Sequence, residues 1–231
     1  MPRFLPLLLL LSAMPVAAHD LWLERQADGV TLYQGHRHSA HDGVGIIVYG
    51  ANFVEEATCL ETTGRNRPLP VAKVVPWRTA ATDCAAIRIA ASSGYWTKTT
   101  WETKNVPKTG VQNVVRSWLS EESVKRIDRW TPGADQPLST GVEITPTVDP
   151  LALKPGDKLI VLVTENRQPK VGAPVAYDDD IRGVTGADGR IAIRLRHDGI
   201  QFIKTSIETP LADGKADLTV RSATLQFEIA P

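Results

Sequence analysis

Long hydrophobic runs are scarce in this 231-residue chain. The most prominent one, residues 5–11, is too short to cross a bilayer, which needs about 20 apolar residues. A positive start at residues 1–3 precedes it, and the small-residue site Pro-Val-Ala-Ala follows at residues 15–18. This pattern predicts a signal peptide over residues 1–18 and a mature chain that begins at His19. We therefore expect a periplasmic or secreted protein that does not itself insert into a membrane.

The chain also lacks an excess of either charge: 26 Lys and Arg residues balance 26 Asp and Glu residues. Nucleic acid and anionic membrane surfaces attract concentrated positive charge, so this balance argues against both as partners. A glycine-rich phosphate loop and a Gly-x-Ser-x-Gly elbow are also missing from the sequence. Their absence lowers the odds of a nucleotide-dependent enzyme or an α/β-hydrolase. We expect a binding protein rather than an enzyme.

Cysteine is limited to Cys59 and Cys84, each of which borders a short apolar stretch of the kind that forms strands. In the oxidising compartment that export predicts, we expect the pair to form a disulfide. The alternatives are a buried free pair and a thiolate metal site. The second is weaker, because neither cysteine belongs to a close-spaced Cys/His motif.

The chain does have many short apolar runs bounded by Gly, Pro, Asn or Asp, which are typical of strands. In the second half the turn signals recur about every 8–12 residues, which predicts a small antiparallel sandwich. Residues 185–190 contain Asp188-Gly189 and predict a hairpin turn. The fold class that we expect is all-β, with two antiparallel β-sandwich units of the immunoglobulin or transthyretin type and one helical segment between them.

The helical segment is predicted over residues 112–130, where apolar side chains recur roughly every three or four positions. Ser120 with Ser123 offers an internal helix cap there. The apolar positions are Val114, Val115, Trp118, Leu119, Val124 and Ile127. The expected domains are an N-terminal β domain with the histidine cluster, a helix and linker, and a C-terminal β-sandwich, over residues 19–111, 112–141 and 142–231.

Four of the five histidines lie in one N-terminal segment: His19, His36, His38 and His41. If residues 21–24 pair with residues 30–33 across a turn, the resulting hairpin brings residue 19 and residues 35–36 to the same end. Side chains two apart on an extended strand share a face, so His36 and His38 are expected to point the same way. The spacing therefore permits one common site.

Imidazole nitrogen is the commonest protein ligand for zinc, copper and nickel. His19, as an N-terminal residue, would add its free α-amine, whose pKa of about 8 is low enough for a metal to displace the proton. The cluster therefore predicts a site for a transition-metal ion (Ni, Co, Cu or Zn), whose identity all-nitrogen ligands leave open. Asp20 and Asp42 could accept hydrogen bonds that orient the imidazoles. The fifth histidine, His197, precedes Asp198-Gly199 and is predicted to be a turn residue.

Several motifs resemble one family. They are Ala-His-Asp-Leu-Trp-Leu-Glu at residues 18–24, Gly35-His36, Asp-Pro-Leu-Ala-Leu-Lys-Pro-Gly-Asp at residues 149–157, and Gly-Ala-Pro-Val at residues 172–175 with Thr-Gly-Ala-Asp-Gly-Arg at residues 185–190. The chain is similar, over nearly all its mature length, to the NikM-like family, the periplasmic component of cobalt/nickel uptake. The resemblance implies a secreted β-sandwich protein with a transthyretin-like second domain. It also implies that the protein captures nickel, cobalt or a related ion and assists its import through an inner- or outer-membrane transporter.

Two other functions stay open. One is an oxidative copper enzyme in which His19 and one further histidine form a brace, which requires an open coordination position and a flat substrate surface. The other is a sandwich that binds an envelope protein through exposed strands, with incidental histidines. Metal titration separates the protein-binding sandwich from the copper enzyme and the metal-binding protein. Turnover with copper and a reductant then separates the copper enzyme from the metal-binding protein.

Overall fold

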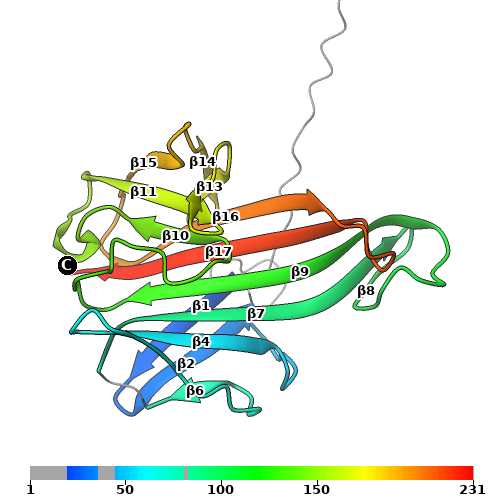
Figure 1. Ribbon diagram of the computed structural model, residues 1–231, viewed down its shortest axis with the longest axis horizontal. Coiled ribbons are helices and arrows are strands. Elements are labelled where there is room, and N and C mark those ends of the chain that lie inside the picture. The colour runs from blue at the N-terminus through cyan, green and yellow to red at the C-terminus, as the bar shows by residue number, and fades with distance from the viewer. Residues whose placement is uncertain (1–19, 36–44, 81–82, 231) are drawn as a thin grey trace, which may run out of the picture.

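The computed structural model describes residues 20–35, 45–80 and 83–230, and its regular structure is almost wholly β-strand (Figure 1). Across these residues seventeen strands form three sheets, and the one helical element is the 3-10 turn η1 (Pro150–Ala152). No helix in the described part of the chain is long and apolar enough to cross a membrane. The predicted all-β sandwich class is confirmed.

A nine-stranded sheet runs through the middle of the molecule, and its longest strands extend to the right of Figure 1. The order is β14-β13-β16-β17-β9-β7-β4-β5, with β8 paired to β7. All neighbours are antiparallel except β17 and β9, which run parallel. The strands are β4 (Val54–Glu61), β5 (Asn66–Pro68), β7 (Cys84–Thr99), β8 (Thr103–Lys104), β9 (Val114–Ile127), β13 (Pro174–Tyr177), β14 (Asp180–Val184), β16 (Gly199–Pro210) and β17 (Leu218–Ile229).

A four-stranded sheet packs on one face of the large sheet, in the lower part of Figure 1. It contains β1 (Asp20–Gln26), β2 (Gly29–Gly35), β3 (Ile46–Ile47) and β6 (Arg78–Thr79). Leu23 and Leu32 are fully buried in one cluster with Ile89 of β7. Gln226 of β17 reaches across, accepting from the Leu23 N–H at 2.9 Å and donating to the Leu23 carbonyl at 2.8 Å. These two hydrogen bonds join the two sheets directly.

A second small sheet covers the opposite face, in the upper part of Figure 1. Its strands are β10 (Glu143–Pro146), β11 (Lys158–Glu165), β12 (Gln168–Pro169) and β15 (Arg190–Arg194). Leu225 and Phe227 of β17 pack into this core, whereas Gln226 between them points to the other small sheet. Alternate side chains of a strand point to opposite faces, so the large sheet contributes to both cores.

The predicted helix over residues 112–130 is wrong, because Val114–Ile127 form strand β9. This strand pairs with β7 on one side and β17 on the other. Both of its faces are covered over much of its length, so the simple alternation of a half-exposed strand is absent. Ser120 and Ser123 donate to the Glu122 carboxylate at 2.8 Å and to the Val142 carbonyl at 3.1 Å, instead of capping a helix.

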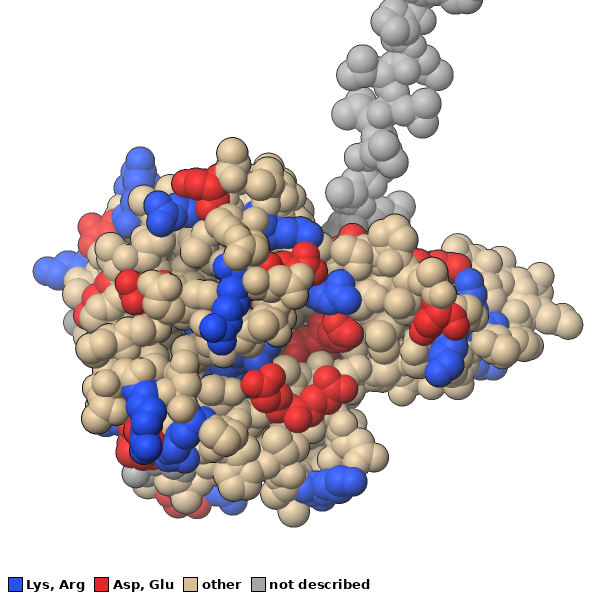
Figure 2. Space-filling view, in the orientation of Figure 1, with Lys and Arg blue, Asp and Glu red and all other residues tan. Residues whose placement is uncertain are grey.

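The large sheet takes strands from both halves of the sequence. β4 and β7 precede β9, and β13, β14, β16 and β17 come after the segment that follows it. β9 therefore joins the two halves as a shared central strand. The face drawn in Figure 2 carries both basic and acidic side chains, and several acidic ones adjoin near its centre.

The hairpin predicted at residues 185–190 is also different from expectation. Gly189 does occupy a left-handed turn position, with φ 72°. However, β14 before the turn pairs with β13, and β15 after it pairs with β11. The turn therefore connects two sheets rather than two paired strands.

Candidate metal centre

The hairpin predicted from the first strands is confirmed. β1 pairs antiparallel with β2, with Leu21 opposite Gln34 and Asp20 opposite Gly35. Gly35 also lies opposite Ile46 of β3. The start of β1, the end of β2 and the start of β3 therefore meet at one end of this small sheet.

The predicted ligands themselves lie outside the described residues: His19, His36, His38 and His41, together with Asp42. Asp20 is described, and its carboxylate forms an ion pair with Lys204 Nζ of β16 at 2.6 Å. Its described partner is thus an ammonium group. The role of Asp20 as an acceptor for an imidazole stays a prediction.

Gly35 allows β2 and the backbone before β3 to approach closely. A Cβ atom at this position would lie 2.2 Å from the Gly45 carbonyl oxygen, and the φ of +150° is one that other residues rarely adopt. Any side chain would therefore push the two segments apart. At the end of the sheet where the three strands meet, the backbone of β2 therefore packs directly against the backbone that precedes β3.

Lys204 adds a second ion pair at this end, to Asp179 at 3.1 Å. Burial acts to lower the pKa of Lys204, but Asp20 and Asp179 outweigh it and hold that pKa above its ordinary value. The lysine therefore stays positively charged at neutral pH. An approaching metal cation would compete with this ammonium for the Asp20 carboxylate.

Glu122 of β9 is a carboxylate that the sequence interpretation missed. It accepts hydrogen bonds from Ser120 Oγ at 2.8 Å, Ser93 Oγ at 3.1 Å and Gln34 Nε2 at 3.5 Å. Within the described part of the chain no cation lies in ion-pair range of it. Burial raises the pKa of Glu122 despite the two serine hydroxyls, which act to lower it.

Gln34 connects Glu122 to the end of the hairpin, because it precedes Gly35 and lies opposite Leu21. The sequence interpretation missed Glu122 because its segment was predicted to be a helix rather than a strand. Reading residues 118–126 with a period of two puts Glu122 on the same face as the buried Val124, where its carboxylate is half-buried. Side chains whose pKa is shifted by burial cluster at functional sites, which makes Glu122 a candidate site residue.

We expect Glu122→Gln to raise the free energy of unfolding at pH 7. A group whose folded-state pKa is raised contributes stability below its unfolded pKa of about 4.3, and that contribution is lost as the pH rises through the folded pKa. The neutral amide removes this loss. Urea unfolding from pH 4 to pH 8 should show a gap that opens with pH, and equal stability of both proteins at pH 7 would contradict the expectation.

His197 is a connection residue between β15 and β16, as predicted. Its Nε2 lies 3.2 Å from Asp178, its Nδ1 lies 2.7 Å from the Asp198 carbonyl, and its ring stacks on Tyr177. The Asp198 carbonyl, and next the Asp178 carboxylate, raise the pKa of His197. Both ring nitrogens already have partners, which makes this residue a suitable control for metal binding.

Cys59 and Cys84 form the predicted disulfide, with an S–S distance of 2.03 Å. With Asp83 they are the one group of three potential metal ligands that converges within the described ranges, inside 4.8 Å. Because the two sulfur atoms are bonded to each other, they are not thiolates and the group is not a metal site.

The end of the hairpin offers two carboxylates, those of Asp20 and Glu122. They lie near the two points of the chain that adjoin the predicted histidine ligands, since Asp20 follows His19 and Gly35 precedes His36. Carboxylates can orient an imidazole or balance the charge of a bound cation. No protein-family model matches the chain, and neither does any curated protein. The family resemblance therefore rests on the sequence motifs alone.

Proposed function

We propose that this chain is a periplasmic protein that binds a transition-metal ion, nickel or cobalt or a related ion, through His19, His36, His38 and His41. In this proposal it delivers the ion to a membrane transporter and supports metal uptake or homeostasis. The single observation that carries the proposal is the strand register, in which Asp20 lies opposite Gly35.

The register matters because directly opposed residues of an antiparallel pair have Cα atoms about 4.5–5.5 Å apart. His19 precedes Asp20 in the chain, and His36 follows Gly35. The two histidines are therefore attached to neighbouring points of one hairpin. This supports a common site, since imidazole arms of that spacing can bind one ion.

The carboxylates at this end support binding of a cation in particular. Glu122 is desolvated and lacks a cationic partner among the described residues, so a positive ion nearby would stabilise its charged form. Asp20 is held by Lys204 at the start of β1. Neutral imidazoles with carboxylates around them are an arrangement that suits late transition metals.

The proposal is tested by titrating the exported protein with Ni²⁺, Co²⁺, Cu²⁺ and Zn²⁺ in a calorimeter. Intact mass should first show a chain that starts at residue 19, because a later start removes the amine and the first imidazole. We expect saturable binding of at least one ion. His36→Ala/His38→Ala should weaken it by more than about tenfold, since losing even a partner that orients a ligand costs about 10–100-fold.

His197→Gln is the matched control, because its ring already has two described partners. It should bind the metal like the unchanged protein. The proposal fails if none of the four ions saturates the correctly processed protein. It also fails if the double histidine variant binds as tightly as the control.

A further inference from the structure

A pocket of about 530 Å³ lies between the nine-stranded sheet and the small sheet that contains β11. Its walls come from three segments: residues 60–66 of the β4–β5 hairpin, residues 133–138, and residues 162–169 of the β11–β12 hairpin. Leu60, Leu138 and Leu162 give it an apolar lining. The volume falls within the range of pockets that hold small molecules, about 300–1,000 Å³.

Polar side chains share this lining. Asn66 and Gln136 present exposed amides. Thr164 is 1% exposed, and its hydroxyl oxygen has no hydrogen-bond partner in the described structure. A buried hydroxyl without a partner is uncommon in folded proteins and calls for an explanation such as a missing ligand or water.

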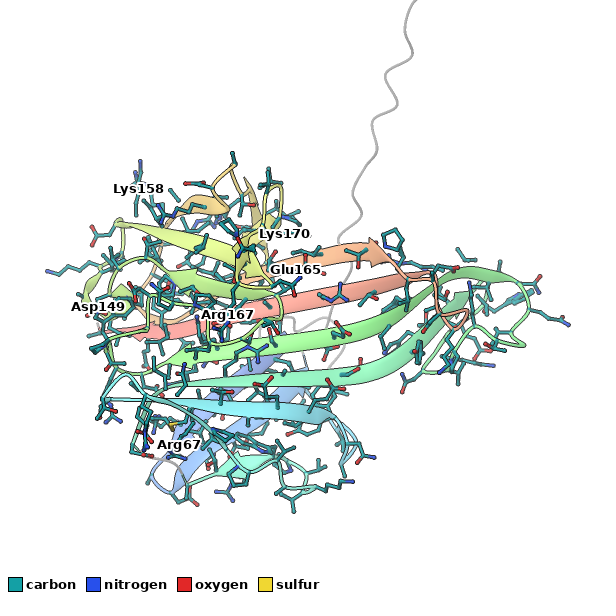
Figure 3. The ribbon with its side chains drawn as sticks, viewed as in Figure 1. Arg67, Asp149, Lys158, Glu165, Arg167 and Lys170 are labelled. Atoms are coloured by element: carbon teal, nitrogen blue, oxygen red, sulfur yellow. A yellow bond between two sulfur atoms is a disulfide. The ribbon has the colours of Figure 1, made fainter. Side chains whose placement is uncertain are left out.

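Arg167 is the sole charged residue among those that line the pocket. Its guanidinium makes no ion pair or hydrogen bond with any described residue, whereas its neighbours Glu165 and Lys170 pair with each other at 2.5 Å. All three are labelled in Figure 3, around the hairpin that joins β11 to β12. Arg167 is exposed, and it brings to the pocket a positive charge that no described residue neutralises.

The turn that presents Arg167 is strained. Asn166 and Arg167 have φ values of 54° and 60°, and Glu165 pairs with Gln168 across them. This is the geometry of a two-residue hairpin turn whose second position strongly favours glycine. The Asn166 N–H donates to the Thr140 carbonyl at 2.7 Å and fastens the turn to the neighbouring segment. An arginine held in a left-handed conformation is the kind of strain that is found at binding sites.

We propose that this pocket binds a carboxylate carried on a short aliphatic body. The carboxylate pairs with the Arg167 guanidinium, whose planar fork matches two carboxylate oxygens. The aliphatic body lies against the leucine side chains and leaves water. A small organic acid and the C-terminal residue of a peptide share this chemistry.

The test is a titration of the ¹⁵N-labelled full chain with octanoate, octanol, acetyl-Gly-Leu and the C-terminal amide of that peptide. We expect saturable amide shifts at Asn66, Gln136 and Arg167 with one of the two carboxylates. The uncharged analogue of the same body should bind at least about tenfold more weakly, as loss of a charge-assisted hydrogen bond requires. Octanoate against acetyl-Gly-Leu identifies which source of the carboxylate the pocket accepts.

Two variants of the same turn separate charge from strain. Arg167→Gly relieves the left-handed strain, so it should melt at the same or a higher temperature while losing at least about tenfold in affinity. Asn166→Gly relieves strain in the same turn but keeps the charge, and it should bind like the unchanged protein. The proposal is overturned if neither carboxylate saturates the shifts, or if Arg167→Gly binds as tightly as Asn166→Gly.

Discussion

Replacing Glu143 by glutamine is expected to lower the free energy of unfolding by about 3–5 kcal/mol, because the amide leaves buried cations without their counter-ion. Glu143 is 2% exposed and lies between the large sheet and the small sheet of β10. Its carboxylate accepts from Lys125 Nζ at 2.6 Å, and Arg88 Nε lies 3.5 Å away. Both cations are 3% exposed.

Backbone and hydroxyl donors complete the surroundings of Glu143. The Leu138 and Ser139 N–H groups donate at 3.0 Å, and Ser139 Oγ donates at 2.9 Å. An amide can accept at one end only, so at least one donor would lose its partner. The carboxylate thus connects β9, β10 and the segment before β10 through one group.

The expected loss depends on pH with a definite sign. Burial acts to raise the pKa of Glu143, but Lys125, the Leu138 N–H and Arg88 together hold that pKa below its ordinary value. A group with a lowered folded-state pKa contributes stability above its unfolded pKa, about 4.3, and the contribution is lost as the pH falls through the folded pKa. The difference between the two proteins should therefore shrink below about pH 4.

Glu56→Gln is the matched control, because Glu56 contacts the same Arg88 at 3.4 Å but its side chain is 56% exposed. It should change the free energy of unfolding by less than about 1 kcal/mol. Adding Lys125→Met to Glu143→Gln removes the stranded ammonium and should recover part of the loss. Urea unfolding of the four proteins measures these differences, and a loss as small as that of the control would contradict the prediction.

Removing the disulfide with Cys59→Ala/Cys84→Ala should destabilise the protein by about 3–4 kcal/mol. The two cysteines are 25 residues apart, and closing a loop of that size removes this much chain entropy from the unfolded state. Both side chains are fully buried in the core shared with Leu23 and Ile89, so the alanines also leave space unfilled.

Reducing the disulfide of the unchanged protein should lower its free energy of unfolding in the same way. The loss should be smaller than that of the double alanine variant, because the reduced cysteines still fill the core. Urea unfolding with and without a reductant gives the comparison, and thiol labelling of the unfolded, unreduced protein should find no free thiol. Equal stability of the oxidised protein and the double alanine variant would show that the bond contributes nothing.

The parts of the fold that were predicted correctly rest on local signals. The hairpin of β1 and β2 needs only two apolar runs and the turn around Asp28-Gly29. The pairing of Cys59 with Cys84 was expected because the chain has two cysteines and the sequence predicts an oxidising compartment. The metal ligands predicted from the histidine spacing stay a prediction, although the confirmed hairpin joins the positions next to two of them.

The errors came where distant pairing decides the structure. β9 carries apolar residues at helical spacing, yet it forms a strand because β7 and β17 supply hydrogen-bond partners on both sides. β17 follows it by about a hundred residues, as the pairing of Ser120 with Val220 shows. Glu122 was missed for the same reason, since its partial burial depends on Ser93 of β7 and Gln34 of β2, which are distant in the sequence.

The amino-acid sequence alone determined many of the strands and turns, β9 excepted, because backbone preference and the alternation of apolar residues act within a few neighbours. It also determined the histidine cluster and the disulfide. Only the tertiary structure decided that one large sheet is shared by both halves, that Glu143 sits among buried cations, and that Arg167 faces a pocket. Each of these depends on contacts between residues far apart in the chain, and a local pattern carries no information about its distant partner.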